Sequence, residues 1–140
     1  MKIQIYLLIG LGFLGQSAFA LNFDCLSAHG LSIQPEELYA AHGEILESGA
    51  VSSVAVTLSD EKDNDSHEVL KVAGPTFPDT KFNPRSERLA GYQKFILEKN
   101  KLDVFELYLP TKIQGHDFVA YVKLAFDGSY PNFKQLRCKL

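Results

Sequence analysis

The sequence has little that points to catalysis or to nucleic acid. Its 14 Lys and Arg residues are scattered among 17 Asp and Glu residues, which gives a formal net charge of -3 and no basic run. Because nucleic-acid backbones are bound by clustered Lys and Arg, we expect no nucleic-acid partner. The chain also lacks a G-x-S-x-G nucleophile motif and a C-x-x-C pair, so two common indications of an enzyme are missing. These absences favour a non-catalytic protein.

The four histidines lack the spacing of a metal site. No two of them are two or four residues apart, the spacings that direct two imidazoles at one ion. They are His29, His42, His67 and His116. His116 precedes Asp117 and is the best candidate for a general base, but adjacent residues of a strand point to opposite faces. We therefore expect no metal and no cofactor.

The acidic segment at residues 60–66 (DEKDNDS) permits two special interpretations, a calcium site and a glycan. Asp63 and Asp65 are two residues apart, as oxygen ligands of Ca²⁺ often are. The EF-hand pattern fails, because His67 stands where a third ligand is required. Asn64 begins an N-x-S acceptor motif for a glycan. A solvated hairpin turn is the favoured interpretation of this segment.

The longest hydrophobic run lies at the start of the chain and has the build of a secretory signal. Lys2 precedes an apolar stretch at residues 6–15 (YLLIGLGFLG), and residues 16–20 (QSAFA) end in a small-x-small pattern. The apolar stretch is shorter than the roughly 20 residues that cross a bilayer, so an uncleaved anchor is the weaker alternative. We expect cleavage after Ala20, a single domain at residues 21–140, and export to the periplasm or the extracellular space. No stable membrane insertion is expected after cleavage.

Two cysteines and no others suit an exported protein with one disulfide bond. Cys25 follows Phe23 in a strand-like alternation, and Cys138 follows Leu136 in another. Both sulfur atoms should therefore fall on apolar faces. We predict that Cys25 and Cys138 lie on neighbouring terminal strands with Cα atoms roughly 5 to 6 Å apart, and that their bond joins the two ends of the domain.

Period-two alternation covers most of the chain after residue 50 and predicts an all-β fold. Two expected strands carry the cysteines. The others lie at residues 51–59, 68–73, 92–98, 102–109 and 118–126. Asp127 and Gly128 indicate a turn before the last strand. About seven antiparallel strands suggest a small sandwich or a partly closed barrel.

One segment, residues 32–48 (SIQPEELYAAHGEILES), has helical spacing. Leu38, His42 and Ile45 recur at intervals of three and four residues, and acidic residues near its start suit a helix N-terminus. Gly43 in its middle disfavours a helix. The segment permits one short helix, which would make the fold α+β, or a further strand of an all-β fold.

The least ordinary segment is residues 74–91, an 18-residue connection with three prolines between two predicted strands. Connections of this length are uncommon in small domains and often bind partners. Aromatic and positively charged side chains of this segment form a candidate interaction surface on an otherwise acidic protein. They are Phe77, Lys81, Phe82, Arg85 and Arg88. The alternative is that its two phenylalanines pack on a sheet edge and protect it from aggregation.

Three functions are compatible with this sequence. We predict an exported, non-catalytic binding or protein-interaction domain. A small barrel that carries an apolar ligand is the alternative, and a cavity lined by inward-facing apolar residues would favour it. The residues expected to line such a cavity are Phe105, Leu107, Phe118 and Val122. A small hydrolase with His116 as its base is the third interpretation.

Overall fold

The chain folds into eight β-strands. The computed structural model describes residues 19–27, 37–62, 65–74, 77–84, 86–100, 104–125 and 133–140. The strands are β1 (Ala20–Ser27), β2 (Glu37–Leu46), β3 (Val51–Lys62), β4 (Asp65–Ala73), β5 (Tyr92–Glu98), β6 (Val104–Pro110), β7 (Asp117–Ala125) and β8 (Lys134–Lys139). A 3-10 turn at Glu87–Leu89 is the only helical element in the described ranges. The described residues contain no helix that is long and apolar enough to cross a membrane.

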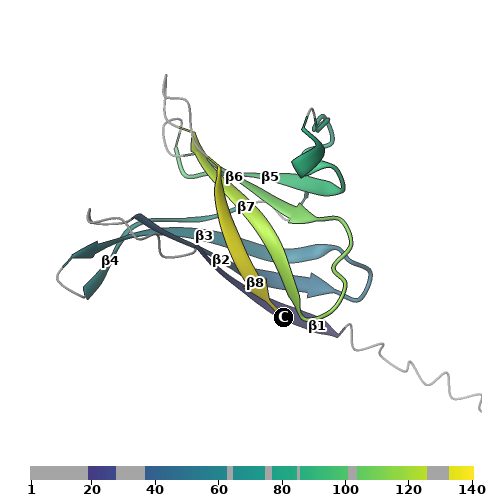
Figure 1. Cartoon of the computed structure of the whole chain (residues 1–140), viewed down its shortest axis with the longest axis horizontal. Helices are drawn as coiled ribbons and strands as arrows, with labels where there is room; N and C mark the ends of the chain where they lie inside the picture. Colours follow the sequence, from purple (N-terminus) through teal and green to yellow (C-terminus); the bar gives the residue numbers. More distant parts are fainter. Residues whose placement is uncertain are drawn as a thin grey trace, which may run out of the picture.

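All eight strands belong to one antiparallel sheet. Their spatial order is β4-β3-β2-β1-β8-β7-β6-β5, so β1 and β8 lie side by side in the middle and β4 and β5 are the edges. The sheet curls until β4 and β5 approach each other, which gives a nearly closed barrel (Figure 1). The predicted all-β fold of antiparallel strands is therefore confirmed.

Of the two alternatives for residues 32–48, the helix is wrong, because the described part of that segment is strand β2. Tyr39, Ala41 and Gly43 are buried while the residues between them are more exposed, which is the period of a strand. Ala41 has a small side chain and Gly43 has none, which conceals this period in the sequence. A Cβ atom at Gly43 would come within 2.8 Å of the Phe23 ring, so glycine permits close packing inside the barrel. β2 also raises the number of strands from about seven to eight.

The other predicted strands agree with the observed ones to within a few residues. β5 has the predicted bounds, and β6 and β7 are shifted by one or two residues. The predicted turn at residues 60–66 is shorter than expected, since β3 continues to Lys62 and β4 begins at Asp65. Strand pairing extends along this hairpin because each added residue satisfies further backbone hydrogen-bonding groups.

Several sequence predictions concern residues outside the described ranges and stay predictions. They are the signal peptide up to residue 18, the site features at His29, Asp63, Asn64 and Arg85, and the turn at Asp127 and Gly128.

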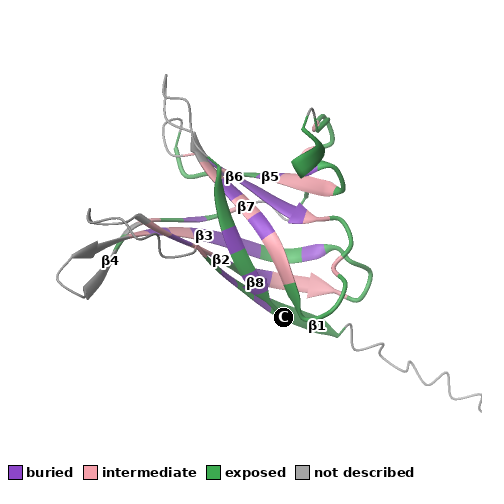
Figure 2. Ribbon diagram, viewed as in Figure 1, coloured by how far each residue is buried: buried purple, intermediate pink, exposed green. Residues whose placement is uncertain are grey.

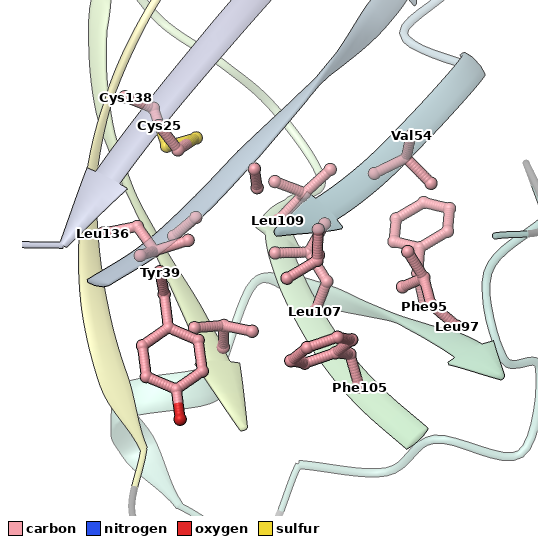
Figure 3. Packing of buried hydrophobic residues seen from close by; sticks show 14 of the residues in the cluster. Cys25, Tyr39, Val54, Phe95, Leu97, Phe105, Leu107, Leu109, Leu136 and Cys138 are labelled. Atoms are coloured by element: carbon pink, nitrogen blue, oxygen red, sulfur yellow. A yellow bond between two sulfur atoms is a disulfide. The ribbon is translucent and has the colours of Figure 1, made fainter. Parts of the chain in front are cut away.

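Apolar side chains from all eight strands fill the interior of the barrel. Figure 2 shows the buried positions along the inner faces of the strands, and Figure 3 shows the packed side chains. The large side chains without exposed surface are Phe23, Phe95, Leu97, Phe105, Leu107 and Leu136. Burying each such side chain contributes roughly 1.5 to 3 kcal/mol. This packing makes most of the barrel interior a hydrophobic core.

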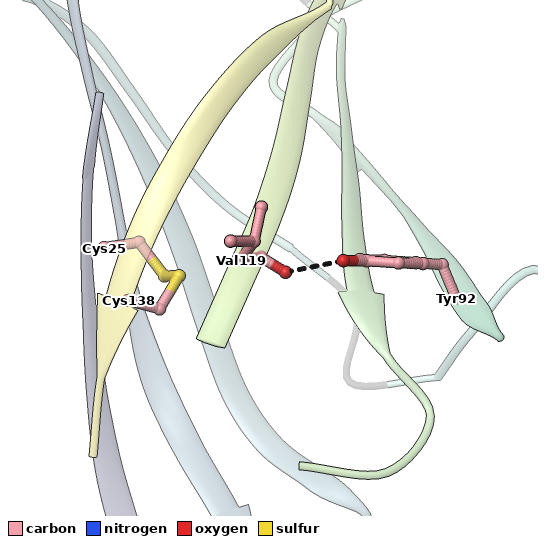
Figure 4. The surroundings of a disulfide bond; sticks show 4 residues. All are labelled: Cys25, Tyr92, Val119 and Cys138. Carbon is pink, nitrogen blue, oxygen red and sulfur yellow. Dashed lines mark hydrogen bonds between the residues drawn. A yellow bond between two sulfur atoms is a disulfide. The ribbon is translucent and has the colours of Figure 1, made fainter. Parts of the chain in front are cut away.

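The disulfide bond predicted between Cys25 and Cys138 is confirmed (Figure 4). The two residues are directly opposed in the β1–β8 ladder, and each is 1% exposed. Their Cα atoms are 4.0 Å apart, closer than predicted. The ladder is short, pairing residues 24–27 with residues 136–139. The bond therefore reinforces the place where the two ends of the domain meet.

The opposite side of the barrel closes by packing. β4 and β5 are not paired in the sheet. Gly74, directly after β4, lies so close to β5 that a Cβ atom there would come within 2.9 Å of Leu97 Cδ2. The backbone N–H of Gly74 donates to the Val54 carbonyl at 3.0 Å. The missing side chain lets the two edges approach at this point.

Candidate functional site

One end of the barrel contains a hollow of about 620 Å³, which we call the mouth pocket. Residues at the ends of β1, β2, β3, β5 and β6 line it, together with the turn after β2, the loop after β6 and the residue after β8. Its apolar lining consists of Leu21, Ile45, Leu46, Val51, Leu109, Pro110, Ile113 and Leu140. Small-molecule pockets commonly have volumes of roughly 300 to 1,000 Å³. The mouth pocket therefore has the size and the lining of a binding site for a small apolar molecule.

The apolar lining follows from strand alternation. Leu21 continues the inward-facing series of Phe23 and Cys25, and Leu109 continues that of Leu107. Leu109 is almost fully buried at the base, whereas Leu21 is 55% exposed at the rim. Inward-facing residues at the end of a barrel have no further layer of side chains above them, so their apolar surface faces the hollow.

One polar side chain, that of Gln93, belongs to the less exposed part of the mouth pocket. Gln93 lies on β5 two residues before the inward-facing Phe95, and it is half-buried. Its side-chain amide has no hydrogen-bonding partner among the described residues. The other polar lining residues are exposed on the turn and the loop. They are Glu47, Ser48, Thr111, Lys112 and Gln114.

The candidate metal and catalytic residues of the sequence lie apart from the mouth pocket in the described part of the chain. No group of three His, Cys, Asp or Glu side chains that could hold a metal ion occurs among them. His116 is exposed before β7 and is absent from the pocket lining, and its backbone carbonyl accepts a hydrogen bond from the Leu140 N–H at 2.8 Å. The lining contains hydroxyl groups, on Ser48 and Thr111, but no histidine that could act as their base.

The unusual connection between β4 and β5 packs on the outer face of the barrel. We call its described residues, 77–84 and 86–91, the strap. The backbone N–H of Asp79 donates to the Lys94 carbonyl on the edge strand β5 at 2.7 Å, and the Asp79 carboxylate lies 3.1 Å from Lys94 Nζ. The backbone N–H of Lys81 donates to the same carboxylate at 3.0 Å. The hydrogen bond from the Lys81 backbone, followed by that from the Lys94 side chain, lowers the pKa of the Asp79 carboxyl group.

Aromatic contacts hold the strap on the sheet. The Phe82 ring packs edge to face on Tyr108 of β6, and Phe133 packs on Tyr108 as well, each with centroids 5.4 Å apart. Tyr108 is only 4% exposed although it is on the outer face. Its hydroxyl donates to Glu106 at 2.7 Å. Burial, with this hydrogen bond and the charge of Glu106, raises the pKa of Tyr108 well above its usual value.

The structure separates the predicted interaction residues of the strap. Phe82 packs on the sheet, whereas the alternative interpretation of this segment required both phenylalanines to do so. Phe77 is 79% exposed, and Lys81 and Arg88 are exposed, with the Arg88 guanidinium 5.9 Å from the centroid of the Tyr121 ring. Arg85 lies outside the described residues. An interaction surface formed by the exposed strap residues stays a prediction.

The sequence did not indicate the lining of the mouth pocket. The four residues expected around a cavity do not line it. Three of them are fully buried in the core, and the fourth, Phe118, packs against Phe23 with ring centroids 6.1 Å apart. A possible signal was the inward-facing positions next to turns, such as Leu109 before Pro110. That signal becomes useful only when the ends of all the strands are placed together.

The comparisons with known proteins do not identify a relative. The sequence matches no protein-family model, and neither a curated protein nor a solved structure is significantly similar to it. Its function is therefore inferred from the geometry of the barrel.

Proposed function

We propose that this chain is a non-catalytic binding domain that holds a small apolar molecule in the mouth pocket. The observation that carries the proposal is the contrast within the barrel. Its interior is filled by side chains without exposed surface, whereas one end retains a hollow of about 620 Å³ with a largely apolar lining. An apolar ligand that enters this hollow would remove apolar surface of both molecules from water, which favours binding.

We also propose that the domain acts outside the cytoplasm. The leader at residues 1–20 supports export. The bond between Cys25 and Cys138 supports an oxidising compartment, since such bonds persist mainly in exported proteins. A soluble carrier or sensor of apolar molecules in the periplasm or the extracellular space is compatible with both features.

The proposal is tested by titrating the protein that begins at Leu21 with N-phenyl-1-naphthylamine, an uncharged apolar probe whose fluorescence increases in apolar surroundings. We expect saturable binding to one site. Ile113→Asn places an amide in the apolar lining and should weaken binding at least fivefold, because that amide would be desolvated by the probe.

A matched control is Ile96→Asn. Ile96 points outward on β5, is 38% exposed and does not line the mouth pocket. This variant should bind the probe as the unmodified protein does. Equal affinities of all three proteins, or no saturable binding by the unmodified protein, would contradict the proposal.

A further inference from the structure

We infer that the mouth pocket selects an uncharged molecule that combines an apolar body with one hydrogen-bonding group, and that Gln93 is the residue that binds this group. This inference rests on the proposed function and adds the chemical class of the ligand. An aliphatic alcohol is the simplest molecule of this class.

The charged side chains of the lining do not favour an ionic ligand. Glu47 follows β2 and Lys112 follows β6, so the exposed rim carries one side chain of each sign. A carboxylate attracted by Lys112 would also be repelled by Glu47, and the reverse holds for an ammonium group. Deeper in the pocket a charged group would find no oppositely charged side chain among the lining residues, which makes its desolvation costly.

The Gln93 amide suits a hydroxyl group. The amide offers both a donor and an acceptor, and a hydroxyl can donate as well as accept. A carboxylate can only accept, and an ammonium group can only donate.

A ligand that covers Gln93 also removes this amide from water. The remaining half-buried or buried lining residues are apolar, Leu109 and Val51 among them, and the amide makes no hydrogen bond to a described residue. Leaving a desolvated polar group without a partner reduces affinity, so a ligand with a matching group is preferred.

The test compares three probes with the same eight-carbon chain, octan-1-ol, octanoate and octylammonium, by isothermal titration calorimetry at pH 7. We expect octan-1-ol to bind at least tenfold more tightly than either ion. Gln93→Leu keeps a similar side-chain size but removes the amide, and it should weaken octan-1-ol binding about two- to tenfold, the range for one hydrogen bond. Gln93→Glu introduces a carboxylate of the same shape and should reverse the preference in favour of octylammonium.

The outcomes separate this inference from the proposed function. If the three probes bind within twofold of one another, or if Gln93→Leu binds octan-1-ol unchanged, Gln93 does not select the ligand, while weakening by Ile113→Asn would still support the mouth pocket as the site. If none of the octyl probes binds while N-phenyl-1-naphthylamine does, this inference is wrong and the proposed function stands. If N-phenyl-1-naphthylamine does not bind either, both are wrong. If Gln93→Leu does not fold, Gln93→Glu decides: a preference for octylammonium supports the inference, and an unchanged order of affinities refutes it.

Discussion

Removal of the bond between Cys25 and Cys138 should cost the barrel a large part of its stability. The bond joins residues separated by 113 positions. In the chain-entropy model, closing a loop of that length in the unfolded chain destabilises the unfolded state by about 5 kcal/mol at 25 °C. Domains have free energies of unfolding of roughly 5 to 15 kcal/mol. A protein without the bond should therefore be marginally stable.

The topology of the folded state gives the bond a second role. The sheet consists of β1–β4 on one side of the bond and β5–β8 on the other, and the short β1–β8 ladder is the only ladder that joins these halves in the described part of the chain. On the other side of the barrel β4 and β5 are not paired. Without the bond, the two halves would be joined only by this short ladder and by the packing between β4 and β5.

The measurement is guanidinium unfolding of three samples: the oxidised protein, the reduced protein and the Cys25→Ala/Cys138→Ala variant. We expect both samples without the bond to lose about 5 kcal/mol, with the alanine variant slightly less stable because its side chains leave small cavities. The variant serves as the control for reductant, to which it should not respond. A loss below about 1 kcal/mol in both samples would refute the reasoning, since the loop entropy would then not determine the stability.

Three further predictions concern single side chains. Gly43→Ala should lower the free energy of unfolding by about 1 to 3 kcal/mol in thermal or chemical unfolding, because the new methyl group would collide with the Ser53 backbone carbonyl oxygen and overlap the Phe23 ring. The pKa of Tyr108 is raised above its usual value of 10.0, so the contribution of this residue to stability is present below pH 10 and is lost as the pH rises further. The free energy of unfolding of Tyr108→Phe should therefore fall less at alkaline pH than that of the unmodified protein. The pKa of Asp79 is lowered from 3.8, so its contribution is present above that pH and is lost as the pH falls through the lower, folded-state value. The protection factors of the strap amides, which compare the observed exchange with the intrinsic rate at each pH, should fall in that acidic range in the unmodified protein. In Asp79→Asn these protection factors should not depend on pH there.

Local alternation was sufficient to predict most strands and the faces of their residues. The alternation in YQKFILE predicted the observed bounds of β5. The two fully buried residues of this strand, Phe95 and Leu97, are two positions apart. The reason is physical, because successive side chains of any strand point to opposite faces whatever the strand pairs with. The same rule places Cys25 and Cys138 on inward faces, and two cysteines permit only one intramolecular pairing. The strands and the disulfide bond were therefore predictable.

Features that depend on how the strands assemble were not predictable. In β2 the small residues Ala41 and Gly43 hide the alternation, and the need for glycine appears only when Phe23 of the neighbouring strand lies against it. The strap packs on the outer face because Phe82 contacts Tyr108 and Asp79 forms an ion pair with Lys94. Neither Tyr108 nor Lys94 stands in a distinctive local sequence pattern, so these contacts could not be predicted.

The mouth pocket has the same origin. Gln93 and Ile113 are separated in the chain, and they line one hollow because an up-and-down meander brings alternate turns and strand ends to the same end of the barrel. Side-chain alternation is a property of each strand, so it can be recognised locally. A pocket is a property of the closed sheet, so it exists only in the folded barrel.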